Sequence, residues 1–123
     1  MSALSLSRRS LAAGEVISVI GELDATNAGD LESFIGGSGR PGEPLLLDLD
    51  GLTFMDSSGL HTLLRVHAGV RERGGCLHLA AVRDVPARVL EITGVEEVLN
   101  VHAGVEEAAA AVCAPPASPS GGL

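Results

Sequence analysis

Short apolar runs alternate with longer amphipathic segments along this chain. Each run is rich in leucine or β-branched residues and is bounded by glycine, proline or charged residues, which predicts a strand rather than a helix. The run at 45–49 is apolar at every position but Asp48, as in a central strand that is buried on both faces. The predicted strands are 4–7, which can pair with its successor as a hairpin, 16–20, 45–49, 76–82 and 98–101.

Four of the amphipathic segments have helical spacing. In the most regular one, positions 60, 63, 64, 67 and 70 follow the i, i+3, i+4, i+7 pattern, and Gly74 and Gly75 end it. Asp24 and Asp56 stand where they can cap the first two helices. Strands that alternate with helices predict an α/β sandwich, with helices over a mostly parallel sheet that the initial hairpin makes mixed. The predicted helices are 25–35, 57–73, 86–93 and 104–112.

One domain fits the length of 123 residues, and a hydrophobic content of 46% is enough for an aliphatic core. We expect this domain to span residues 1–113. Residues 114–123 contain three proline, two serine and two glycine residues, and such a composition predicts a disordered tail. The apolar stretches fall far short of the roughly 20 residues that a membrane span needs, so we expect a cytoplasmic protein with no membrane partner.

The charge excludes several classes of function. Sixteen acidic residues against eight basic ones give a net charge of −8, which makes nucleic acid a poor partner. All eight basic residues are arginine, so mechanisms that require a lysine, such as Schiff bases and Walker loops, are excluded. Cys76 and Cys113 have no zinc spacing, and we expect one buried and one loose thiol. The histidines lack the i, i+4 spacing of a helical metal site, so we expect no metal or cofactor.

The segment 52–60 joins the most buried predicted strand to the most regular helix, and such loops often carry function in α/β proteins. Asp56 as N-cap leaves Ser57 and Ser58 in the first helical turn, where the helix dipole would stabilise a phosphate. The simpler interpretation is that these residues only start a helix. That interpretation does not explain Gly59, which costs about 1 kcal/mol relative to alanine inside a helix. The glycine indicates that some group approaches the backbone closely.

Three stretches together resemble the STAS domain of bacterial anti-sigma factor antagonists: Gly21-Glu22-Leu23-Asp24, Asp48-Leu49 and the segment 52–60. The resemblance spans about residues 4–112. It implies a STAS-type α/β sandwich in which a mixed sheet of four to five strands carries about four helices, mainly on one face. It also implies that the domain catalyses no reaction and binds its partner near the stretches that carry the resemblance. The implied contact residues are Gly21, Glu22, Leu23, Asp24, Asp56, Ser57, Ser58, Gly59 and Leu60.

The same resemblance implies a switch. In that family the serine after the aspartate is phosphorylated by an anti-sigma factor that is also a serine kinase, so Ser57 is the matching acceptor and Ser58 the second choice. The unphosphorylated antagonist binds the anti-sigma factor and releases a sigma factor, the phosphorylated form does not bind, and a phosphoserine phosphatase would reset it. The family often has threonine three residues after the first aspartate. Here Asn27 holds that place and Thr26 precedes it, so we transfer no contacts to these two residues.

Two alternatives remain open at this point. Asp48-Leu49-Asp50-Gly51 resembles the opening motif of haloacid-dehalogenase phosphatases, with Asp48 as nucleophile and Asp50 as general acid or base. That family also needs a lysine and a second acidic pair for magnesium, and this chain has no lysine. The other alternative keeps the STAS fold but makes the protein a constitutive scaffold or a ligand-binding module of a signalling assembly.

Overall fold

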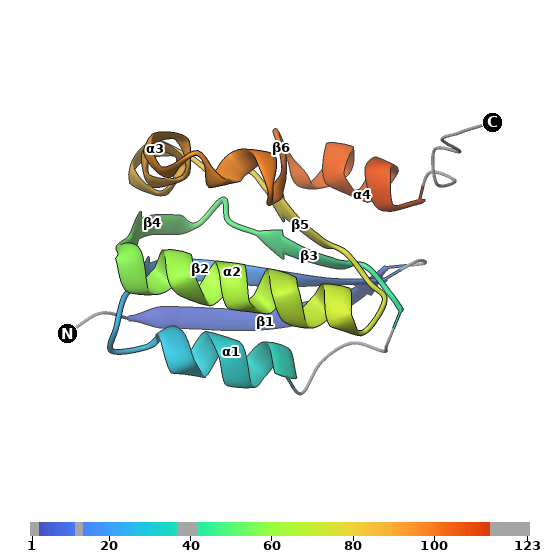
Figure 1. Cartoon of the computed structure of the whole chain (residues 1–123), viewed down its shortest axis with the longest axis horizontal. Helices are drawn as coiled ribbons and strands as arrows, with labels where there is room; N and C mark the ends of the chain where they lie inside the picture. The colour runs from blue at the N-terminus through green and yellow to red at the C-terminus, as the bar shows by residue number, and fades with distance from the viewer. Residues whose placement is uncertain (1–2, 12–13, 37–41, 114–123) are drawn as a thin grey trace.

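The computed structural model describes residues 3–11, 14–36 and 42–113 (Figure 1). The tail predicted at 114–123 lies outside these residues. Six strands are described: β1 (Leu4–Leu11), β2 (Gly14–Leu23), β3 (Leu45–Asp48), β4 (Leu52–Met55), β5 (Leu77–Ala80) and β6 (Asn100–His102). The helices of the same part of the chain are α1 (Ala28–Gly36), α2 (Ser57–Glu72), α3 (Asp84–Thr93) and α4 (Val105–Cys113), with a short 3-10 turn, η1 (Val95–Glu97).

The strands form one mixed sheet in the order β1-β2-β3-β5-β6. β1 and β2 are antiparallel, which confirms the predicted hairpin, and the other pairs are parallel. β3 and β4 pair in succession with the same strand, β3 with residues 15–18 and β4 with residues 21–23 of β2. β4 was not predicted and raises the number of strands to six. Its burial does not alternate, since Leu52 and Met55 are buried and Thr53 and Phe54 exposed, so the sequence pattern there did not indicate a strand.

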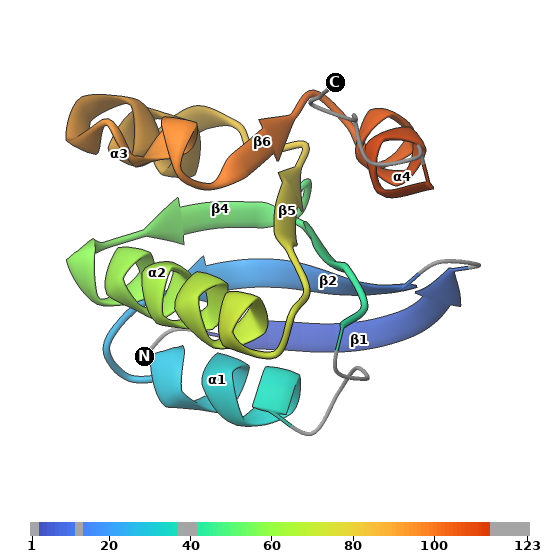
Figure 2. The same ribbon diagram turned by 45° about the vertical axis from the view of Figure 1, so that its right-hand side comes forward.

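Both faces of the sheet are covered by helices (Figure 2). One core contains alternate strand residues such as Ile17 and Leu47 together with Leu31 of α1, Leu63 of α2 and Leu90 of α3. On the opposite face, a smaller cluster packs Ala108 of α4 against residues of three strands, Val16, Leu46 and Ala80. Three helices therefore contribute to one core and the fourth covers the other face. Leu45, Leu46 and Leu47 are all buried, so the expectation of a strand buried on both faces is confirmed.

Cys76 is exposed, which corrects the expectation that a cysteine within this apolar run is buried. The run was assigned to a strand from residue 76, but β5 begins at Leu77. Cys76 belongs instead to the turn that follows α2. The strand begins one residue later than predicted because the turn formed by Gly74 and Gly75 extends one residue further than the apolar pattern suggests.

Two histidines face each other across the last two strands of the sheet. Nδ1 of His78 lies 3.0 Å from Nε2 of His102, and the ring centroids are 5.1 Å apart. Burial, and then the neighbouring His102, lowers the pKa of His78 below its ordinary value. As the pH falls through about 6.5, His78 therefore binds a proton less readily in the folded protein than in the unfolded chain.

Because the unfolded chain gains protons that the folded chain resists, the free energy of unfolding should decline on acidification through about pH 6.5 and be highest above it. Urea unfolding of the wild type and of His78→Gln at several pH values between about 7.5 and 5.5 would measure this. The wild type should lose more stability over this interval than the variant. Equal losses would contradict the assignment of this pH dependence to His78.

Candidate functional site

The two stretches predicted to form the site meet at one end of the sheet. In the pairing of β2 with β4, Glu22 stands opposite Phe54 and Leu23 opposite Met55. The next residue, Asp56, donates its backbone N–H to the carbonyl oxygen of Leu23 at 3.3 Å. Strand pairing thus places residues 21–24 beside the start of α2. We call this surface, made of residues 20–24 and 53–58, the rim.

Asp56 caps α2, as the sequence predicts. Its backbone is extended, and its Oδ1 accepts a hydrogen bond from the N–H of Gly59 at 3.1 Å. Its carbonyl oxygen accepts from the N–H of Leu60 at 3.0 Å. Ser57 and Ser58 consequently occupy the first helical turn, where Ser57 is exposed and Ser58 half-buried. A phosphate on Ser57 would lie at the positive end of the helix dipole and next to the Asp56 carboxylate.

Gly59 is a glycine because the core of the protein itself approaches the helix there. A Cβ at this position would lie 2.7 Å from Cγ of Met55 and 2.9 Å from Cγ of Leu23. The close approach that the sequence indicated therefore comes from the strand ends and not from an external group. Leu23, Gly59 and Leu60 are all buried, so these three predicted contact residues support the rim from beneath.

Asp24 caps the turn that leads into α1, since its carbonyl oxygen accepts a hydrogen bond from the N–H of Ala28 at 2.8 Å, and the regular helix begins three residues later than the sequence predicts. The helix begins at Ala28, and Asp24 closes the preceding turn by accepting hydrogen bonds from the N–H of Thr26 at 2.9 Å and from its Oγ1 at 2.6 Å. Asn27 is buried and ties the turn to β2: its Oδ1 accepts from the Asp24 N–H at 3.0 Å, and its Nδ2 donates to the Glu22 carbonyl at 2.8 Å. The sequence signal for this turn was weak because these side chains bond locally within a loop.

Gly21 adopts a left-handed backbone with φ of 115° at the point where the register with β4 shifts. Its N–H donates to the carbonyl oxygen of Gly51 at 3.0 Å, and its own carbonyl accepts from Oγ1 of Thr53 at 3.1 Å. Glu22 follows with an exposed side chain. Gly21 therefore lies beside the bulge at which Thr53 is the extra residue of β4, and Glu22 is the exposed residue of the stretch 21–24.

Sequence reasoning missed two apolar residues on the rim. The side chain of Ile20 is 52% exposed and that of Phe54 is 39% exposed. Val19 and Leu23 of β2 face the main core and Val16 faces α4, so Ile20 lies on the α4 side of the sheet. Glu22, between Ile20 and the core residue Leu23, is exposed, and Phe54 is its cross-strand partner. α4 covers Val16 further along that face, but Ile20 and Phe54 remain uncovered. The sequence contained one signal for the exposure of Ile20. This residue ends the apolar run at 16–20, and no predicted helix was assigned to cover it.

A shallow cavity of about 290 Å³ lies between α1 and α2 beside the half-buried Ser58. Arg65 spans it, with Nε 3.2 Å from Oε2 and NH2 2.9 Å from Oε1 of Glu32. These hydrogen bonds are the main cause that lowers the pKa of Glu32 and raises that of Arg65. Both side chains are exposed, so the pair orients the two helices more than it stabilises them. The described lining is Ala25, Ala28, Gly29, Glu32, Ser58, His61 and Arg65.

The motif Asp48-Leu49-Asp50-Gly51, which resembles the opening motif of a phosphatase, forms the turn between β3 and β4. Oδ1 of Asp48 accepts a hydrogen bond from the N–H of Asp50 at 3.1 Å. The carboxylate of Asp50 is exposed and pairs with the guanidinium of Arg83, which precedes α3. One aspartate thus closes its own turn and the other is paired with an arginine, an arrangement that accounts for both residues structurally.

Comparison with solved structures identifies the same architecture in three other proteins. An anti-sigma factor antagonist from Mycobacterium paratuberculosis is 24% identical with a TM-score of 0.81, covering 89% of this chain and 94% of that one. The anti-sigma factor antagonist SpoIIAA in its unphosphorylated form is 22% identical with a TM-score of 0.73, over 88% and 96% of the two chains. The STAS domain of a SulP transporter from Vibrio cholerae is 23% identical with a TM-score of 0.58, over 73% and 74%.

At these identities the likenesses show a shared fold. Within the described residues, no helix is long and apolar enough to cross a membrane. The family model of the STAS domain matches residues 12–108, which include all of the rim and both helices that flank it. The chain therefore belongs to the STAS domain family.

Proposed function

We propose that this protein is an anti-sigma factor antagonist whose binding is switched off by phosphorylation of Ser57. The observation that carries the proposal is the exposed Ser57 hydroxyl in the first turn of α2, directly after the capping residue Asp56. Structural relatives described as anti-sigma factor antagonists support it. The protein would act by binding and not by catalysis.

The partner is an anti-sigma factor with serine kinase activity, which docks on the rim. The exposed part of the rim combines apolar side chains, Ile20 and Phe54, with the acidic side chain of Glu22 and the Ser57 hydroxyl. Exposed apolar residues beside polar groups are typical of protein interfaces. The predicted contact residues Gly21, Asp24, Asp56 and Ser58 complete this surface, while Leu23, Gly59 and Leu60 hold it in shape.

The charge of the rim explains how one phosphate would prevent binding. A phosphoserine adds about −1.5 to −2 charge at neutral pH. On Ser57 it would lie beside the Asp56 carboxylate and near Glu22, so a partner that fits the neutral hydroxyl would meet a cluster of like charges. The α2 dipole stabilises the phosphate where it is, and the fold needs no rearrangement. A phosphoserine phosphatase would restore the binding form.

The first test is the intact mass of the protein purified from its own cells, followed by fragmentation to locate any phosphate. We expect a phosphorylated fraction with the phosphate on Ser57, and no such fraction in Ser57→Ala. Phosphate on Ser58 alone would overturn the assignment of the acceptor. Absence of phosphate under several growth conditions would overturn the switch and favour a constitutive scaffold.

A further inference from the structure

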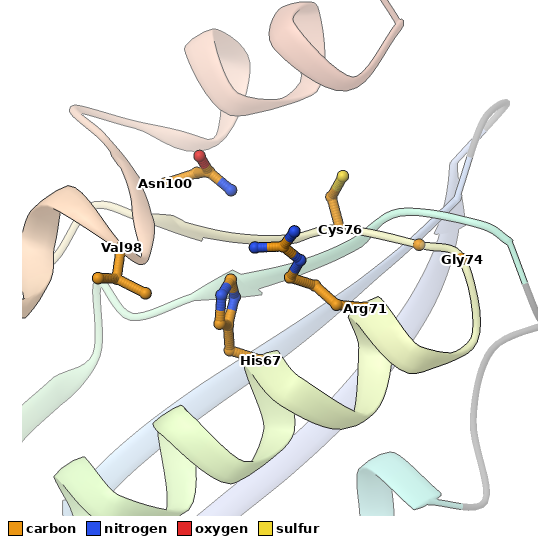
Figure 3. Close-up of a pocket in the computed structure, with 7 residues that line it drawn as sticks. His67, Arg71, Gly74, Cys76, Val98 and Asn100 are labelled. Atoms are coloured by element: carbon orange, nitrogen blue, oxygen red, sulfur yellow. The ribbon is translucent and has the colours of Figure 1, made fainter.

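A second cavity lies at the opposite end of α2, between the last turns of that helix, the turn that follows it and the segment 98–100 (Figure 3). Its volume is about 590 Å³, which is within the range of small-molecule sites. Arg71 stands roughly 20 Å along the helix from Ser57, given a rise of about 1.5 Å per residue. The cavity is thus separate from the rim. The described residues that line it are His67, Arg71, Gly74, Gly75, Cys76, Val98 and Asn100.

Arg71 supplies a positive charge that nothing in the described part of the chain neutralises by contact. Its side chain forms no ion pair or hydrogen bond there, whereas Arg65 is held by Glu32 and Arg83 by Asp50. No carboxylate is among the described residues of the lining. Arg71 is exposed and lines the cavity, and a guanidinium that contacts no carboxylate favours an anion there, since its planar donors match carboxylate and phosphate oxygens.

His67 adds a second polar group to the same wall. Its Nδ1 is buried and has no hydrogen-bond partner among the described residues. Burial, and then Arg71, lowers the pKa of His67, so the imidazole is neutral at neutral pH and carries one N–H donor and one acceptor nitrogen. Figure 3 shows the imidazole and the guanidinium of Arg71 extending from the helix into the same space. Because Nδ1 has no accessible surface, Nε2 is the ring nitrogen that can donate its N–H to an anion held beside Arg71.

The opposite wall is less polar and limits the kind of anion. Val98 is 51% exposed and presents its apolar side chain to the cavity, while Asn100 is fixed because its Nδ2 donates to the Leu77 carbonyl at 2.9 Å. A single guanidinium suits one charged head group and not a polyphosphate, which proteins hold with several cations or many backbone N–H groups. We propose that this cavity binds a small organic anion, whose carboxylate or phosphate monoester head is held by Arg71 and His67 and whose apolar part lies against Val98.

The test is a titration of the full-length protein, labelled with nitrogen-15, with hexanoate, butyl phosphate and the neutral control hexanamide. We expect at least one of the two anions to shift the backbone amide signals of Gly75, Cys76 and Asn100 saturably. A dissociation constant of about 1 mM is reasonable for so small a ligand. Arg71→Gln should weaken binding at least about tenfold, which corresponds to loss of a charge-assisted contact. Arg88→Gln, which removes an exposed arginine of α3, should leave it unchanged.

Each outcome decides something. Binding of hexanoate alone identifies the head group as a carboxylate, and binding of butyl phosphate alone identifies it as a phosphate ester. The proposal is overturned if neither anion saturates, if hexanamide binds equally well, or if Arg71→Gln binds like the wild type. Val98→Trp, which fills the cavity and leaves both polar groups in place, should also abolish binding. Ser57→Ala should bind the anion as the wild type does, so the test of this cavity is independent of the test of the phosphorylation switch.

Discussion

Gly59→Ala is expected to lower the free energy of unfolding by about 2 kcal/mol, with a larger loss for Gly59→Val. The added Cβ would lie 2.7 Å from Cγ of Met55, closer than such atoms approach in folded proteins. Because Leu23 and Met55 are themselves fully enclosed, neither can move aside without disturbing the ends of β2 and β4. Urea unfolding at neutral pH measures the loss.

Gly69 provides the matched control within the same helix. A Cβ at Gly69 meets nothing within 4 Å. Gly69→Ala should therefore show only the gain in helix propensity and raise the free energy of unfolding by about 0.5–1 kcal/mol. If Gly59→Ala were as stable as the wild type, the close packing of Leu23 and Met55 would not be the reason for the glycine. Close approach of a partner would then become the better explanation.

Those features of the fold that depend on local pattern could be predicted from the sequence. α2 follows from its periodic apolar residues, the cap at Asp56 and the glycines that end it, and the structure places it at Ser57–Glu72. β4 could not be predicted, because it exists through its pairing with the end of β2 and shows no alternation of its own. The start of α1 was predicted three residues too early for a related reason, since an aspartate that caps a single turn resembles one that caps a regular helix.

The same distinction holds for the candidate site: features set by local sequence could be predicted, and features set by contacts between distant elements could not. The position of Ser57 in the first turn of a helix could be predicted from a short motif, and the structure shows that this residue is exposed. Which motif residues face solvent could not be deduced, because Leu23, Gly59 and Leu60 are buried by contacts between elements distant in sequence. The exposure of Phe54 depends likewise on which helices cover which part of the sheet. The cavity beside Arg71 could not be predicted either, since α2, the turn that follows it and the segment 98–100 come together only on folding.

Ser57→Asp is expected to reduce the affinity for the anti-sigma factor at least about 30-fold, whereas Ser57→Ala should bind within about threefold of the wild type. The aspartate places a permanent negative charge beside Asp56 at the centre of the rim, and the alanine removes the hydroxyl without adding charge. Titration calorimetry with the purified anti-sigma factor measures both affinities. When ATP is added, the wild type should lose binding and Ser57→Ala should keep it, because the alanine variant lacks the proposed phosphate acceptor.

Ser10→Asp separates a local effect from a general effect of charge. Ser10 is exposed on β1 and pairs with Glu15, at the end of the hairpin opposite to the pair of Leu4 and Gly21. The variant gains the same charge as Ser57→Asp roughly 20 Å from the rim, taking about 3.3 Å per residue along the strand. At that distance salt screens the added charge, so binding should match the wild type. Equal weakening by both aspartates, or equal binding by Ser57→Ala and Ser57→Asp, would contradict a switch located at Ser57.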